Sequence, residues 1–127
     1  MNISTSTLAK RKLKSHIAKY GKDSNFVMTE QMLKTWFHVI NKAAFRNKLP
    51  VPKFEIRNLR GAWGLAEAKG NCVISMSTAI DSRELMIGTL AHEMVHQWQY
   101  LFEATMSHTG SFLKWKRYFK KNLQISL

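Results

Sequence analysis

The sequence has a single cysteine, Cys72, and only two prolines in 127 residues. One cysteine excludes an intramolecular disulfide and a cysteine-rich zinc ribbon within these residues. A lone cysteine is typical of proteins in a reducing compartment, so we expect an intracellular protein. No stretch has the length of a membrane-spanning helix and no apolar signal segment is present, so we expect no membrane partner. We also expect a monomer, and the brevity of the chain suits the cytoplasm or nucleoid of a bacterial or phage-infected cell.

Acidic residues are also scarce. Eight Asp and Glu oppose 20 Lys and Arg, which gives a net charge of +12. A charge of this sign and size favours a polyanionic partner, with nucleic acid first. The same charge can instead serve only solubility or the attraction of acidic substrates. All eight acids lie between residues 23 and 103, so both ends of the chain carry only basic charges.

These two basic ends supply the candidate contacts to DNA. Residues 1–22 are expected to form a basic N-terminal helical segment, with helical apolar spacing over residues 7–20. Such a helix also suits an acidic lipid surface, a partner protein or a solvated face. Residues 23–127 are expected to form a single compact domain that ends in a second basic helix. The candidate nucleic-acid-binding residues are Lys10, Arg11, Lys12, Lys14, Lys114, Lys116, Arg117, Lys120 and Lys121.

The apolar spacing of the domain predicts helices on both sides of a group of short strands. The predicted helices are Glu30–Asn47, Asp81 to Tyr100 or Phe102, and Ser111–Asn122. The predicted strands are Lys53–Arg57 and a hairpin of Trp63–Ala68 and Cys72–Ser77 around Lys69-Gly70-Asn71. This order predicts an α+β domain, in which a small antiparallel sheet packs against the helices.

The most specific feature is His92-Glu93-Met94-Val95-His96, an H-E-x-x-H motif inside the long predicted helix. Residues four apart lie on one face of a helix, so both imidazoles can bind one Zn²⁺. Glu93 lies beside the first ligand and can reach a water on the metal. It can take a proton from that water and pass it to the leaving amine of a peptide. The motif therefore predicts a zinc metalloprotease with Glu93 as its catalytic base.

A catalytic zinc site needs a third protein ligand and an open position. Metzincins require a glycine and a further histidine where this chain has Gln99 and Phe102, so that subclass is excluded. Downstream of His96, the ordinary zinc ligands are Glu103 and His108. We favour His108, because it lies in a loop that lets the chain turn back towards the motif. Glu103 is the alternative ligand.

Further segments around the motif add to the pattern. They are Phe37-His38-Val39-Ile40-Asn41, Phe45-Arg46-Asn47-Lys48-Leu49-Pro50, Gly61-Ala62-Trp63-Gly64 leading to Ile74 and Ser75, Thr89-Leu90-Ala91 before the motif, Gln97-Trp98 after it, and His108 with Gly110 and Phe112. Together, from about Leu33 to Phe119, these residues resemble the SprT-like zinc metalloproteases. The resemblance implies a zincin-like fold, one catalytic zinc bound by His92, His96 and His108, and Glu93 as the general base.

The resemblance also implies a substrate. Family members of the Spartan type cleave proteins that are bound or crosslinked to DNA, and DNA activates them. Two departures stand out: the single cysteine cannot form the C-terminal zinc ribbon of many members, and Thr109 separates His108 from Gly110. The expected function is thus a zinc-dependent endopeptidase acting on DNA-associated or DNA-crosslinked proteins. The alternatives are a regulatory, nucleic-acid-binding zincin-fold protein with little or no protease activity, and an ordinary zinc peptidase.

Overall fold

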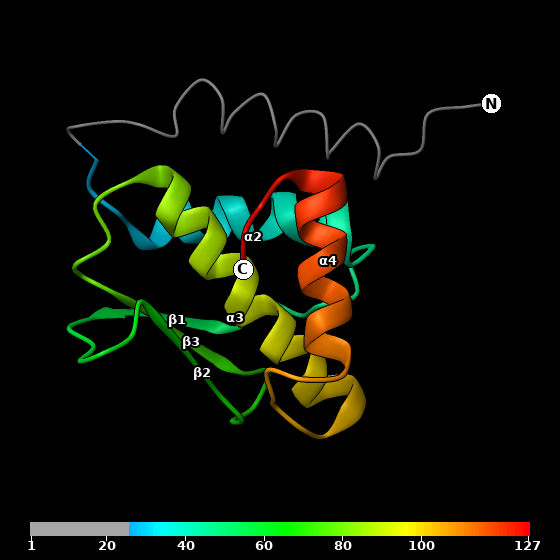
Figure 1. Cartoon of the computed structure of the whole chain (residues 1–127). Helices are drawn as coiled ribbons and strands as arrows, with labels where there is room; N and C mark the ends of the chain where they lie inside the picture. The colour runs from blue at the N-terminus through cyan, green and yellow to red at the C-terminus, as the bar shows by residue number, and fades with distance from the viewer. Residues whose placement is uncertain (1–25) are drawn as a thin grey trace.

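The computed structural model describes residues 26–127. The predicted basic helix of residues 7–20, with Lys10, Arg11, Lys12 and Lys14, lies outside the described residues. Residues 26–127 form three helices and one three-stranded sheet, which confirms the α+β class and is compatible with a minimal zincin-like domain (Figure 1). The elements are α2 (Glu30–Ala44), β1 (Lys53–Arg57), β2 (Gly64–Glu67), β3 (Val73–Ser77), α3 (Arg83–Glu103) and α4 (Ser111–Leu123).

Helix α2 ends at Ala44, three residues before the predicted end at Asn47. The reason is local: Arg46 and Asn47 adopt left-handed backbone angles, with φ of +53° and +60°, which a helix cannot contain. The buried Asn41 side chain holds this turn together. Its amide donates to the Leu49 carbonyl at 2.9 Å, and its oxygen accepts the Leu49 N–H at 3.2 Å. The chain is thereby redirected from α2 towards β1.

The sheet is mixed, so the prediction of an antiparallel sheet is wrong for one of its strands. The strand order is β1-β3-β2, in which β2 pairs with β3 antiparallel and β1 pairs with β3 parallel. The hairpin predicted around Lys69-Gly70-Asn71 is confirmed. Its second strand returns between β1 and β2, and this insertion makes β1 and β3 parallel. Every residue of β3 is buried, as befits the central strand.

Cys72 precedes β3 instead of lying within it, which corrects the predicted strand start. Its φ of +86° belongs to the end of the hairpin turn, not to a strand. The side chain is buried, and this burial raises the pKa of the thiol to about 11. The thiol therefore stays protonated and packs as a small apolar group, as the sequence predicted.

Helix α3 is the centre of the domain, because β2, β3, α2 and α4 all contact it (Figure 1). Its N-cap is Ser82, one residue after the predicted start, and the Ser82 hydroxyl accepts the Leu85 N–H at 3.1 Å. It ends at Glu103, because Ala104 turns left-handed with a φ of +53°. Its buried residues are Met86, Ile87, Thr89, Leu90, Ala91, Glu93, Met94, Val95, His96, Gln97 and Gln99. None of the described helices is long and apolar enough to cross a membrane.

Candidate metal centre and active site

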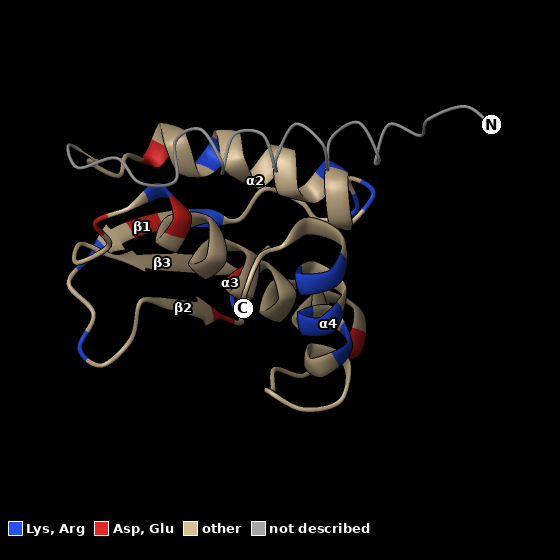
Figure 2. Cartoon of the chain, turned by 45° about the horizontal axis from the view of Figure 1, so that its top comes forward, with Lys and Arg blue, Asp and Glu red and all other residues tan. Residues whose placement is uncertain are grey.

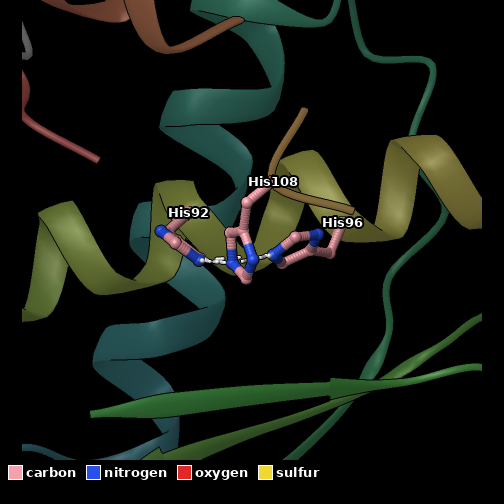
Figure 3. A group of neighbouring side chains, drawn as sticks. All are labelled: His92, His96 and His108. Atoms are coloured by element: carbon pink, nitrogen blue, oxygen red, sulfur yellow. Dashed lines mark hydrogen bonds between the residues drawn. The ribbon is translucent and has the colours of Figure 1, made fainter. Parts of the chain in front are cut away.

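The structure brings together three histidines from two parts of the chain. His92 and His96 lie one turn apart on α3, and His108 reaches them from the loop between α3 and α4 (Figure 3). Their Nε2 atoms form a nearly equilateral triangle, with edges of 3.2 Å (His92 to His96), 3.2 Å (His96 to His108) and 3.3 Å (His108 to His92). Three nitrogens at about 2.0–2.1 Å from a tetrahedral zinc lie roughly 3.3 Å apart. The three side chains could therefore hold one metal ion, and their geometry fits zinc.

The ring of Phe112 packs against all three histidines. Gly110, with a φ of +58°, ends the loop, and α4 starts at Ser111, so Phe112 lies in the first turn of the helix. Its buried ring centroid lies 4.8 to 5.1 Å from the centroids of all three imidazoles. Farther along α4, Trp115 packs against Phe45 at a centroid distance of 4.5 Å. Aromatic packing therefore holds α4, and with it the His108 loop, against the core.

Gln99 connects the motif to the His108 loop. This side chain is fully buried, and its Oε1 atom lies 2.8 Å from His96 Nδ1. The same oxygen accepts the Ser107 N–H at 3.2 Å, while the Gln99 Nε2 donates to Ser111 Oγ at 3.1 Å. Since an amide oxygen can only accept, His96 must carry its proton on Nδ1, which leaves a lone pair on Nε2. Gln99 therefore orients one imidazole and holds the chain on both sides of His108, at Ser107 and at Ser111.

Glu103, the alternative third ligand, contacts Ser111 and not the three histidines. It accepts a hydrogen bond from the Ser111 hydroxyl, which in turn accepts from Gln99. Among the described residues, the group that could hold a metal consists of His92, His96 and His108, without Glu103. The structure thus assigns Glu103 a contact with the start of α4, and brings His108 to the other two histidines.

Glu93 lies inside the protein next to the three histidines. Its side chain is only 5% exposed, and burial raises the pKa of its carboxyl group from 4.5 to about 7. Gly64 of β2 and Thr89 of α3 are its close neighbours. A carboxyl group that titrates near neutral pH is suited both to accept and to release a proton at that pH.

Burial also determines the protonation of the motif histidines. It lowers the pKa of His92 from 6.5 to about 4, and the neighbouring His96 and His108 add to this effect. The pKa of His96 is lowered by burial as well, although the hydrogen bond to Gln99 opposes the shift. Both imidazoles are therefore neutral at pH 7, which is the form that binds metal.

A cleft of about 640 Å³ opens beside the histidines. His92, Glu93 and His108 line one end of it. The rest is lined by residues 62–64 and by six residues at the start of α3: Ser82, Glu84, Leu85, Ile87, Gly88 and Thr89. The remaining wall is the C-terminal tail, residues 124–127, which returns from α4 across the face of α3 (Figure 1). Gly88 permits this close approach, since a Cβ there would lie 3.1 Å from the Ser126 carbonyl oxygen. The cleft is large enough to take a short segment of a ligand chain.

The family follows from comparison with known proteins. A family model described as the SprT-like family matches residues 33–126 of the chain. The chain belongs to the SprT-like family. Membership indicates a metalloprotease-like domain, and the matched region contains the whole histidine cluster and most of the tail. The curated proteins searched for relatives contain no match.

Helix α4 of this SprT-like domain carries the described part of the predicted DNA-binding set. Figure 2 shows Lys and Arg positions along this helix. They are Lys114, Lys116, Arg117, Lys120 and Lys121, and all five are exposed. Within residues 26–127, none of these five side chains pairs with a carboxylate. The helix therefore presents uncompensated positive charge to solvent, close to but outside the cleft.

Sequence reasoning missed two glutamines of the SprT-like site, Gln97 and Gln99. Gln97 is fully buried and donates to the Pro50 carbonyl at 2.8 Å and to the Asn71 carbonyl at 2.9 Å, which fixes α3 to the segments that lead into β1 and β3. Their position could have indicated this role. Both glutamines follow the H-E-x-x-H motif directly, on a helix that is expected to be buried in the core. The role of the C-terminal tail was also missed, since no periodic pattern marks it.

Proposed function

We propose that this chain is a zinc-dependent endopeptidase that acts on DNA-associated or DNA-crosslinked proteins. His92, His96 and His108 are the proposed zinc ligands, and Glu93 is the proposed general base. The observation that carries the proposal is the triangle of three Nε2 atoms, 3.2 to 3.3 Å apart, at the end of a cleft that Glu93 also lines. Membership of the SprT-like family supports the same chemistry.

In the proposed chemistry, the metal activates water and substrate, and the protein transfers the proton. When bound, zinc acidifies a water molecule and polarises the carbonyl of the scissile peptide. Glu93 accepts the proton of the attacking water and then delivers it to the amine that leaves. Its burial suits both steps, because the raised pKa makes the protonated and ionised forms close in free energy near neutral pH. Gln99 keeps His96 in the tautomer that offers Nε2 as a ligand.

The proposed association with DNA depends on charge. The net charge is +12, and the five cations of α4 are exposed and do not belong to the cleft lining. A duplex bound along α4 would leave the cleft free for a protein on the same DNA. The alternative is a regulatory DNA-binding domain with little or no protease activity. It would bind DNA through the same cations of α4, but Glu93 would not catalyse cleavage.

Zinc content tests the ligand set. The purified protein is expected to contain about one zinc per chain. His108→Ala should lose the metal, whereas Glu103→Ala should retain it, because Glu103 contacts Ser111 instead of the histidines. Metal loss in the Glu103 variant alone would reverse the assignment of the third ligand.

Cleavage tests the activity and separates the alternatives. The wild-type protein, loaded with zinc, is mixed with a DNA-binding protein in the presence and absence of DNA, and fragments are measured by gel and mass spectrometry. Fragments should form with DNA present and be absent with Glu93→Gln, which should still bind zinc and DNA. No cleavage by the wild type would favour the regulatory alternative, and cleavage that ignores DNA would favour an ordinary zinc peptidase.

A further inference from the structure

We propose that the cleft between Trp63 and the C-terminal tail is a subsite for a large apolar side chain of the substrate polypeptide, next to the bond that is cleaved. The proposal rests on the proposed function, since it names the kind of polypeptide that the same site takes. His92, Glu93 and His108 line the cleft together with Trp63 and residues 124–127, so one ligand can touch both parts at once.

The lining of this part of the cleft is mainly apolar. Its largest member, Trp63, is 51% exposed, which is unusual for so large an aromatic residue in a domain with a well-packed core. The same cleft is lined by apolar residues of α3 and of the tail: Leu85, Ile87, Ile125 and Leu127. Of these residues, Trp63, Leu85 and Leu127 keep surface exposed to water, and a bound leucine, methionine or phenylalanine side chain would cover it.

The charge of the cleft lining disfavours a nucleic-acid strand as its ligand. Among the described residues that line it, the charged ones are Glu84 and Glu93, and no lysine or arginine is present. The lysines and arginines of residues 26–127 therefore lie outside this cavity. A nucleic-acid strand needs cations along its phosphates, so its binding there is disfavoured. A neutral, apolar stretch of polypeptide meets no such penalty.

The tail that forms the far wall is firmly attached. Gln124 has a φ of +56°, which turns the chain back from the end of α4, and the Ile125 N–H donates to the Phe119 carbonyl at 3.2 Å. The Ile125 side chain is 3% exposed and belongs to the core. The next residue, Ser126, rests on Gly88. The wall therefore has a defined position, as a subsite that selects by size requires.

The test uses the full zinc-loaded chain and an unfolded protein with its DNA activator. Mass spectrometry of the fragments should show Leu, Ile, Met or Phe enriched within two positions of the cleaved bonds. A peptide built on such a site is then compared with its Phe→Ala counterpart. The wild type should prefer the Phe peptide by about tenfold in kcat/KM. Trp63→Ala should remove that preference by weakening the Phe peptide alone.

Leu65→Ala is the matched control, because Leu65 of β2, two residues after Trp63, is an exposed apolar residue that does not line the cleft. It should keep the wild-type preference. The two peptides are also titrated by calorimetry into Glu93→Gln, with and without Trp63→Ala, so that selectivity is measured without cleavage. Equal binding of both peptides, or a preference that survives Trp63→Ala, overturns the subsite. Competition by a single-stranded oligonucleotide for the Phe peptide also overturns it. If the peptides are not cleaved but the Phe peptide still binds more tightly, the proposed protease activity is contradicted and the proposed subsite is supported.

Discussion

Gly64 in β2 faces Glu93 in α3 so closely that a Cβ atom at position 64 would lie 2.8 Å from Glu93 Oε2 and 2.8 Å from Thr89 Cγ2. No real Cβ atom tolerates such contacts, so the strand can approach the helix only because this residue is glycine. The φ of Gly64 lies outside the left-handed region, and the requirement is therefore steric rather than conformational. The position of the proposed base depends directly on the absence of one side chain in the neighbouring strand.

Gly64→Ala is expected to move Glu93 while leaving the zinc ligands in place. The added methyl group must displace either the carboxylate or the strand, and a misplaced base costs at least about tenfold in kcat. Zinc content should remain at the wild-type level. Gly70→Ala is the control, since Gly70 has nothing within 4 Å of its Cβ position but a φ of +57°. It should lower stability by about 1 kcal/mol and leave kcat unchanged. Wild-type kcat in Gly64→Ala would refute the argument.

Gln99→Leu is expected to weaken zinc binding. The substitution removes the acceptor for His96 Nδ1 and the contacts to Ser107 and Ser111, so one ligand loses its orientation and the His108 loop loses its anchor. Loss of such a partner typically costs about 10- to 100-fold in metal affinity. A competition titration against a chromophoric chelator measures this change.

Gln97→Leu is the matched control for that experiment. Gln97 is equally buried, but its hydrogen bonds go to the Pro50 and Asn71 carbonyls instead of to the zinc site. The variant should lose thermal stability and keep zinc affinity within about threefold of the wild type. Gln99→Glu preserves an acceptor for His96 and should recover part of the affinity. Equal losses of affinity in both leucine variants would mean that Gln99 acts only through overall stability.

Glu93→Gln is expected to stabilise the metal-free protein, and increasingly so as the pH rises. In the folded chain the pKa of Glu93 is raised to about 7 from 4.5, so ionisation opposes folding, and this destabilisation develops between pH 4.5 and 7. His92 acts in the opposite sense: its pKa is lowered to about 4 from 6.5, so its contribution to stability is lost as the pH falls through that window. The lowered pKa of His96 acts in the same sense as that of His92, and both oppose the effect of Glu93 in the wild type.

Denaturant unfolding in the presence of a chelator measures this difference. The two proteins should have similar stability near pH 4.5, and the glutamine variant should be the more stable by about 3 kcal/mol above pH 7. The variant should gain stability as the pH rises from 4 to 6.5, because the lowered pKa values of His92 and His96 then act without the opposing effect of Glu93. A difference that does not change with pH would show that Glu93 ionises normally in the folded protein.

Neutralising the α4 cations is expected to weaken DNA binding and its dependence on salt. The replaced residues are Lys114, Lys116, Arg117, Lys120 and Lys121, all changed to glutamine or alanine. Each lost phosphate contact should reduce the slope of log K against log salt by about 0.9 for duplex DNA. Since these side chains are exposed, the fold and the cleavage of DNA-free peptides should be unaffected.

The matched control removes the same charge from other exposed positions. These are Lys34, Lys42, Lys48, Lys53 and Lys69. This variant should retain most of the wild-type slope if binding is concentrated on α4. A slope that falls equally in both variants would indicate that affinity follows net charge and not a defined surface. The basic residues Lys10, Arg11, Lys12 and Lys14 form a third variant, whose effect measures the proposed share of the N-terminal segment.

The local features of this protein were readable from its sequence, because each is determined by residues close together in the chain. The spacing of apolar residues placed α3 and α4 within a few residues of their observed bounds, and the turn around Gly70 placed the β2–β3 hairpin. The H-E-x-x-H spacing alone put His92 and His96 one helical turn apart. The net charge and the single cysteine likewise needed no structure to be interpreted.

Tertiary structure decided whatever depends on neighbours distant in the chain. Strand β1 pairs parallel with β3, although its own alternating pattern fits either direction. The sequence offered both Glu103 and His108, and the packing of Phe112 against the imidazoles is what places His108 beside His92 and His96. The tail became a wall of the cleft only by resting on Gly88. The periodicity of the sequence predicts which residues are buried. Which residues they contact depends on how all the helices and strands pack together.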